Sequence, residues 1–153
     1  MTAKELKIIK DTSAELLKLL GFEAQAEVSE NVEENTISVQ IETEEAGVLI
    51  GYHGEAIASF QVILGMIISK KLGEWHRVVV NVGDYREKRE ETLTRMALNA
   101  AQKAHFSGQP VILSSLSSYE RRVIHLALSD NTEIETLSEG EGLDRRLIIK
   151  PKT

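Results

Sequence analysis

A Gly-x-x-Gly turn separates two apolar segments in the stretch GVLIGYHGEAIASFQVIL, residues 47–64. Paired glycines free the backbone to turn sharply and to approach another molecule closely. The apolar segment after the turn continues to about Leu72 and predicts a helix, and unpaired N–H groups at a helix start attract anions. The turn therefore predicts either a ligand loop that works through its backbone or a plain tight connection between two helices.

The order of periodic segments around this turn predicts an α+β domain. Ile37, Val39 and Ile41 alternate with polar residues, as in a half-buried strand. The helix after the turn is apolar nearly all round, which predicts that it is the central buried helix. In chain order we expect a helix ending at Gly21, strands at 22–29 and 35–42, a short helix at 44–50, the long helix to about Leu72, and a strand at 76–82.

The second half of the chain predicts a second small α+β unit. Asp84 and Ser117 are suitable helix N-caps, and Ser117 with Glu120 fits a capping box. In chain order we expect a helix from Asp84 to Gly108, a strand at 109–113, a helix from Ser117 to about Ser129, and a hairpin of strands at 132–137 and 143–150. The predicted domains are residues 2–83 and 84–150, without a flexible linker.

The charge of the chain is unevenly distributed. The net charge is −6, which argues weakly against a nucleic-acid partner. However, residues 1–83 hold 7 basic and 13 acidic residues, whereas residues 84–153 hold 11 of each and seven of the eight arginines. Because arginine binds phosphate and carboxylate through two parallel hydrogen bonds, the second half can carry a local anion-binding face.

Composition also excludes several classes of protein. The chain has no cysteine, which excludes disulfides and thiolate metal sites. Its amino end is an amphipathic charged segment without a signal-peptide pattern, and its longest apolar run, residues 56–68, is too short to span a bilayer. We therefore expect a cytoplasmic protein with no membrane insertion, no metal and no cofactor.

The stretch YERRVIHLAL, residues 119–128, carries the most distinctive charged pattern. Arg121 and His125 are four residues apart, so they share one face of the predicted helix, and Arg122 lies about 100° around from Arg121. The alternative interpretation is a solvated helix face with ion pairs to neighbouring glutamates such as Glu120. Taken alone, that alternative is favoured.

The first half resembles a KH domain of the prokaryotic, type II arrangement, αββααβ, with a three-stranded mixed sheet and its helices on one side. The resemblance implies that Gly51, Tyr52, His53 and Gly54 form the loop that clamps the backbone of single-stranded nucleic acid. KH loops commonly carry a basic residue at a middle position. Here Tyr52 and His53 stand there, followed by Glu55, so the Coulomb attraction is reduced.

The second half resembles the R-three-H domain, a three-stranded sheet with two helices that binds single-stranded nucleic acid through its Arg-x-x-x-His. The closing segment TEIETLSEGEGLDRRLIIKP fits as well, and it places Arg145 and Arg146 on the last strand. One of these two side chains should face the helices and the other solvent. The resemblance implies a nucleic-acid site of Arg121, Arg122, His125, Arg145 and Arg146.

A KH domain followed directly by an R-three-H domain resembles the bacterial SpoIIIJ-associated protein family, also called Jag or KhpB. The resemblance covers nearly the whole chain. Family members usually have an amino-terminal Jag domain and a linker, which we expect this chain to lack, so functions of that domain are not transferred.

Three functions remain in competition. The resemblance favours a non-enzymatic binder of single-stranded RNA, or of single-stranded DNA, that acts as a post-transcriptional regulator or RNA chaperone. The second is an interaction protein whose KH half has lost RNA affinity and binds a protein, such as a second KH-domain protein. The third, a nuclease or hydrolase using His125, is the least favoured, since no carboxylate pair, metal cluster or activated nucleophile accompanies that histidine.

Overall fold

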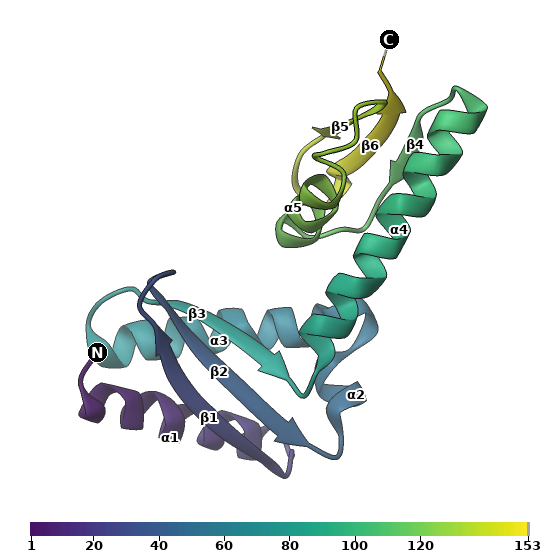
Figure 1. Cartoon of the computed structure of the whole chain (residues 1–153). Coiled ribbons are helices and arrows are strands. Elements are labelled where there is room, and N and C mark those ends of the chain that lie inside the picture. Colours follow the sequence, from purple (N-terminus) through teal and green to yellow (C-terminus); the bar gives the residue numbers. More distant parts are fainter. Residues whose placement is uncertain (153) are drawn as a thin grey trace. The chain divides into compact units, whose positions relative to one another are not determined.

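The computed structural model describes residues 1–152, which form two compact units of mixed α+β structure (Figure 1). The first unit comprises Met1–Arg86, and the second begins at Glu87. No helix of the described residues is long and apolar enough to cross a membrane.

The first unit has the element order expected for a type II KH domain. Its elements are α1 (Ala3–Leu19), β1 (Ala24–Asn31), β2 (Thr36–Thr43), α2 (Ala46–Ile50), the 3₁₀ turn η1 (Tyr52–Gly54), α3 (Glu55–Leu72) and β3 (Arg77–Val82). The sheet order is β1-β2-β3, with β1 antiparallel and β3 parallel to β2. The α2–α3 pair therefore forms the crossover between the two parallel strands.

The core of this unit lies between the sheet and the two long helices, α1 and α3, which cover the same face (Figure 1). Ile37, Val39 and Ile41 are at most 2% exposed, which confirms the alternation that the sequence predicts for this strand. They pack with buried side chains of the helices, including Ile9 of α1 and Leu64 of α3.

The prediction that α3 is the central buried helix holds for only one stripe of its surface. Only Ile57, Phe60, Leu64 and Ile68 are buried, while the side chain of Met66 is 68% exposed. The fold has one layer of helices on one sheet, so a helix buries the stripe that faces the sheet and leaves the opposite stripe open. Apolar composition alone does not reveal how many layers will cover a helix.

The second unit has the two helices and three strands expected for an R-three-H domain. Its elements are α4 (Tyr85–Ser107), which starts in the last residues of the first unit, β4 (Val111–Leu113), α5 (Ser118–Ala127), β5 (Ile134–Glu139), the 3₁₀ turn η2 (Gly142–Asp144) and β6 (Arg146–Pro151). The antiparallel sheet has the order β4-β6-β5. Small side chains at Ala97, Ala101 and Ala104 bring α4 close to the core, which includes Ile124 and Ile149.

The closing hairpin differs from the sequence prediction. Strand pairing ends at Glu139 and Arg146, so the last strand begins three residues later than expected and Arg145 lies outside it. Gly140 has a left-handed φ of 93°, and a Cβ on it would lie 2.9 Å from the carbonyl oxygen of Asp144. The connection between β5 and β6 is therefore a tight turn followed by η2, and not the simple hairpin turn that the sequence predicts.

Candidate nucleic-acid interface

The Gly-x-x-Gly turn forms a tight loop between α2 and α3. Gly51 ends α2 with φ 73°, and Gly54 precedes α3 with φ 83°. His53 between them also adopts a left-handed φ of 50°, a region that histidine enters more often than most residues. Three residues of the turn therefore lie in the part of backbone space that glycine favours.

Contacts with neighbouring atoms add to the requirement for glycine at both ends of the loop. A Cβ on Gly51 would lie 2.6 Å from the Cβ of Ala56, and a Cβ on Gly54 would lie 2.7 Å from the hydroxyl oxygen of Tyr85. Both distances are too short for real carbon contacts. The left-handed φ of both glycines and the contact of Gly51 with Ala56 are demands of the fold itself, whereas a Cβ at Gly54 would push the end of the Tyr85 side chain aside.

The middle of the loop presents aromatic surface rather than charge. The rings of Tyr52 and His53 stack with centroids 4.0 Å apart and planes 13° apart, and Tyr52 is 74% exposed. No side chain of the described residues caps the first turn of α3. The backbone N–H groups of Gly54 and Glu55 donate within the loop, to the carbonyl oxygens of Gly51 and Tyr52, so the remaining N–H groups of this turn are the ones that can serve a ligand. The loop can donate backbone hydrogen bonds and stack, but Glu55 in the first turn of α3 opposes an anion.

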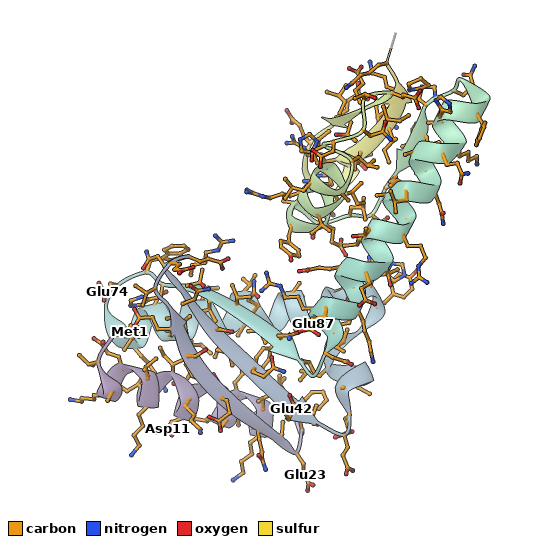
Figure 2. The ribbon with its side chains drawn as sticks, viewed as in Figure 1. Met1, Asp11, Glu23, Glu42, Glu74 and Glu87 are labelled. Atoms are coloured by element: carbon orange, nitrogen blue, oxygen red, sulfur yellow. The ribbon has the colours of Figure 1, made fainter. Side chains whose placement is uncertain are left out.

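The surface of this unit is dominated by carboxylates. Figure 2 labels four of them, Asp11, Glu23, Glu42 and Glu74, and all four are exposed. An acidic surface repels a polyanion at long range and lowers its association rate. Any nucleic-acid contact of this unit therefore depends on close-range hydrogen bonds and stacking.

In the second unit, α5 begins at the capping box that the sequence predicts. The hydroxyl of Ser117 accepts from the backbone N–H of Glu120, and the carboxylate of Glu120 accepts from the backbone N–H of Ser117 at 2.8 Å. The other carboxylate oxygen of Glu120 accepts from Nε of Arg89 on α4 at 2.8 Å. Both side chains are largely buried, at 17% exposure for Arg89 and 12% for Glu120.

The sequence left open whether Glu120 forms an ion pair with Arg121, and the structure shows that it does not. Glu120 pairs with Arg89, whereas Arg121 donates from Nη1 to the carbonyl oxygen of Leu116 at 2.6 Å and from Nη2 to the hydroxyl of Ser118 at 3.0 Å. Arg121 thus forms no ion pair with a described residue, and its guanidinium is held in a fixed position. Its guanidinium has five N–H donors, so donors remain for a ligand.

His125 lies one turn further along α5 and is exposed. Its Nδ1 shares a hydrogen bond with the hydroxyl of Thr136 on β5. This contact fixes the ring and leaves Nε2 for a ligand. Sequence reasoning did not single out Thr136, although its position two residues after the buried Ile134 places it on the helix side of the sheet.

Arg145 and Arg146 lie on different sides of the second sheet. Nε of Arg145 donates to the hydroxyl of Ser138 at 2.9 Å, and Ser138 follows Thr136 on the helix side of β5. Arg146 is paired across the strands with Glu139, on the open face of the sheet, with 3.7 Å between its Nη2 and a carboxylate oxygen.

The structure therefore brings together only three of the five residues expected to form the nucleic-acid site of the second unit. Arg121 and His125 share one face of α5, and Arg145 lies on the same side of the sheet. Arg122 is placed elsewhere on the circumference of α5 and is exposed, and Arg146 lies on the opposite face of the sheet. The hydroxyls of Thr136 and Ser138 are the polar contacts that sequence reasoning missed.

Comparison with known proteins agrees with this two-part architecture. The KhpA/KhpB KH domain matches residues 10–82, and the R-three-H domain matches residues 91–151. RNA-binding protein KhpB of Clostridium symbiosum is 31% identical over 154 aligned residues, which cover 98% of this chain and 69% of that protein. The chain belongs to the KhpB family.

Other KhpB-family relatives show the same pattern. RNA-binding protein KhpB of Bacillus subtilis is 29% identical and aligns with 97% of this chain and 70% of its own length. RNA-binding protein KhpB of Lactiplantibacillus plantarum is 32% identical over 88% of this chain, but only 41% of that relative is covered. The resemblance inferred from sequence motifs, and the fold class of a KH domain followed by an R-three-H domain, are confirmed.

Proposed function

We propose that this KhpB-family protein is a non-enzymatic binder of single-stranded RNA, and that its charged contact is the face formed by Arg121, His125 and Arg145. The observation that carries the proposal is that two arginine side chains and one histidine side chain, from α5 and the segment before β6, are each held by a hydrogen bond to the unit itself. Ordered cations lose little side-chain entropy on meeting a phosphate. The printed names of the relatives, and the KH and R-three-H domain types, support RNA as the ligand.

Each side chain has a distinct part in this contact. Arg121 and Arg145 supply permanent charge to the phosphate groups. His125 adds a charge when it is protonated, and its Nε2 then donates to phosphate while Nδ1 donates to Thr136. Such contacts position the RNA backbone but do not read its bases. Binding of low sequence specificity suits an RNA chaperone or a post-transcriptional regulator in a bacterial cell.

The KH unit contributes a weaker contact in this proposal. Its loop offers backbone N–H groups and the stacked rings of Tyr52 and His53, on an acidic surface. Replacing both residues by lysine is expected to strengthen RNA binding, and replacing both by aspartate to abolish the contribution of the loop. If neither change alters affinity, the loop does not touch RNA.

The main test is a fluorescence-anisotropy titration of labelled single-stranded RNA across a pH series and a salt series. We expect a dissociation constant of roughly micromolar or weaker at physiological salt, the range of non-specific phosphate contacts. Arg121→Ala should weaken binding about fivefold at every pH, since it removes one permanent cation from the contact. His125→Ala should also weaken binding, because it removes the Nε2 contact to phosphate.

Arg146→Ala is the matched control, because it removes one arginine from the opposite face of the same sheet. It should leave the affinity nearly unchanged. Unlabelled single-stranded DNA of the same sequence, used as a competitor, tests the preference for the 2′-hydroxyl of RNA. Unchanged affinity in both Arg121→Ala and His125→Ala would place the RNA site elsewhere.

A second candidate function is protein binding through α3. Val62, Ile63 and Met66 are 61%, 49% and 68% exposed and form an apolar stripe on the uncovered side of this helix. Exposed apolar stripes of this kind mark interaction surfaces, and the partner that we consider is a second KH-domain protein. Sedimentation of the wild type and of Val62→Glu/Met66→Glu with and without such a protein tests it. Absence of RNA binding together with a complex that this double substitution abolishes would favour the second candidate.

A further inference from the structure

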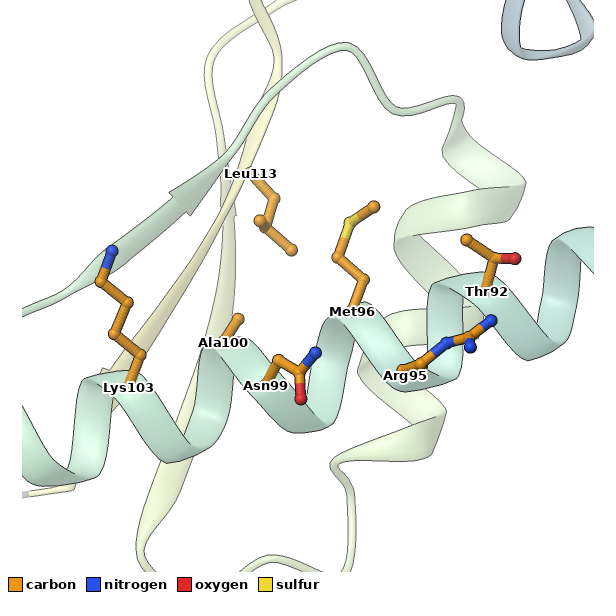
Figure 3. A pocket seen from close by; sticks show the side chains of 7 residues that line it. All are labelled: Thr92, Arg95, Met96, Asn99, Ala100, Lys103 and Leu113. Atoms are coloured by element: carbon orange, nitrogen blue, oxygen red, sulfur yellow. The ribbon is translucent and has the colours of Figure 1, made fainter.

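The second unit has a shallow groove of about 400 Å³ between α4 and β4 (Figure 3). Arg95, Asn99 and Lys103 line it along α4, and Met96, Ala100 and Leu113 form its apolar floor. In Figure 3 Met96 and Leu113 point toward each other across the groove. We propose that this groove is a second contact for the sugar–phosphate backbone of single-stranded RNA, an inference that rests on the RNA-binding function proposed above.

The charge around the groove is unusual for this chain. Residues 92–119, which include most of α4 and all of β4, contain no aspartate or glutamate, although the chain has 24 acidic residues among 153. Arg95 and Lys103 lie within this stretch, and neither forms an ion pair with any described residue. Glu91, one turn before Arg95 on α4, is the nearest acidic residue in the sequence and is not within ion-pair distance among the described residues. The two cations beside the groove therefore remain available to a polyanion.

The spacing of the polar residues suits an extended chain. Arg95, Asn99 and Lys103 follow one another at intervals of four residues, so they form a line along one side of α4. The two cations are separated by two helical turns, or about 12 Å along the axis. They can therefore contact two separate phosphates of one strand, with the amide of Asn99 between them and the aliphatic floor against a sugar or base.

An acidic peptide is the alternative occupant of such a groove. Protein partners are usually held by large anchors, often aromatic, in well-packed pockets. This groove is shallow and has an aliphatic floor. None of the described residues that line it is aromatic. Phosphate groups require only accessible cations, so the observations favour RNA.

The test compares two double substitutions in the full chain. Arg95→Gln/Lys103→Gln removes both cations of the groove, and Lys4→Gln/Lys7→Gln removes two exposed cations of α1 as a control of equal charge. The first variant should bind a long single-stranded RNA about three- to tenfold more weakly. Its slope of log affinity against log salt should fall by about 1.4, since each phosphate contact of a single strand contributes about 0.7. The control should match the wild type.

A photocrosslinking amino acid gives a second readout that does not depend on charge. Placed at Asn99 it should crosslink to bound RNA. Placed at Thr94, which is exposed on α4 but does not line the groove, it should not.

The outcomes separate this inference from the function on which it rests. Wild-type RNA binding that is weakened by Arg121→Ala but unchanged by Arg95→Gln/Lys103→Gln would overturn the groove alone. If the wild-type protein binds no RNA, both the groove contact and the proposed RNA-binding function are overturned. Unchanged RNA binding together with an acidic peptide that binds only the wild-type groove would assign the groove to a protein.

Discussion

The ion pair between Arg89 and Glu120 yields a quantitative prediction about α5, the helix that carries Arg121 and His125. The pair joins α4 to the first turn of α5 at 2.8 Å, and its side chains are 17% and 12% exposed. Substituting Arg89 by methionine keeps much of the aliphatic packing of the side chain and removes its charge. The carboxylate of Glu120 then stays largely buried without a cation.

The magnitude follows from the environment of that carboxylate. Loss of one partner of a fully buried pair costs about 3–5 kcal/mol. Here Glu120 retains the hydrogen bond from the backbone N–H of Ser117 and lies in the first turn of a helix, where a negative charge is favoured. We therefore expect Arg89→Met to lower the stability of the second unit by about 2 kcal/mol.

Native-state hydrogen exchange read by mass spectrometry is the assay, because it reports each unit separately. A loss of about 2 kcal/mol should accelerate exchange of the α5 amides about 30-fold. Amides of α1, in the first unit, serve as the internal control and should not change. Adding Glu120→Gln to Arg89→Met should recover more than half of the loss, since the neutral amide no longer needs a cation.

Two results would refute this reasoning. One is acceleration of α5 exchange by less than about threefold in Arg89→Met, which would mean that water already hydrates the carboxylate. The other is a double variant whose loss equals the sum of the two single losses, which would mean that the two side chains are not coupled.

Three further predictions concern local features of the fold. Gly54→Ala should lower the free energy of unfolding by about 2–3 kcal/mol, because it combines a φ of 83° with a contact at 2.7 Å to a tyrosine hydroxyl. Gly21→Ala, with φ 86° and nothing within 4 Å of the new Cβ, should cost about 1 kcal/mol. Urea unfolding followed by far-UV circular dichroism measures both, and equal losses would refute the role of the contact. Ser117→Ala should cost about 1 kcal/mol and accelerate exchange of the α5 amides, and unaltered exchange would contradict the capping role. For Glu5, the hydrogen bond from the backbone N–H of its N-cap residue is the main cause of a lowered pKa in the folded state. The stabilisation it provides is present above the pKa of the unfolded chain and is lost as pH falls through the folded pKa. Glu5→Gln should therefore reduce the acid sensitivity of unfolding followed by circular dichroism, and identical pH profiles would count against this.

Much of the architecture was predictable because its signals are local. Alternation at Ile37, Val39 and Ile41 identifies a strand with one buried face, and the structure buries those side chains. Ser117 and Glu120 are three residues apart, so the hydrogen bonds of the capping box depend only on the start of one helix. The KH and R-three-H motifs likewise occupy short stretches, and together they indicate the family from sequence.

The details of the candidate site depend on contacts between residues far apart in the chain. Glu120 has Arg121 as its neighbour but pairs with Arg89, 31 residues away, because the packing of α5 against α4 brings those two side chains together. The choice between Arg145 and Arg146 depends on where strand pairing stops, which the tight turn around Gly140 decides. Neither outcome is encoded in a local pattern.

The sequence by itself therefore determined which residues are apolar, the order of helices and strands, and that arginines concentrate in the second half. Only the tertiary structure decided which apolar residues are covered. The α3 segment is apolar nearly all round, but a single sheet can bury only one stripe of it, so Met66 stays exposed while Leu64 is fully buried. The same holds for charge, since Arg95 has Glu91 one turn before it in the sequence but forms no ion pair with a described residue, and neither does Lys103. Which side chains are buried and which charges form ion pairs depends on the surfaces that meet on folding. Those surfaces come from segments that lie far apart in the sequence.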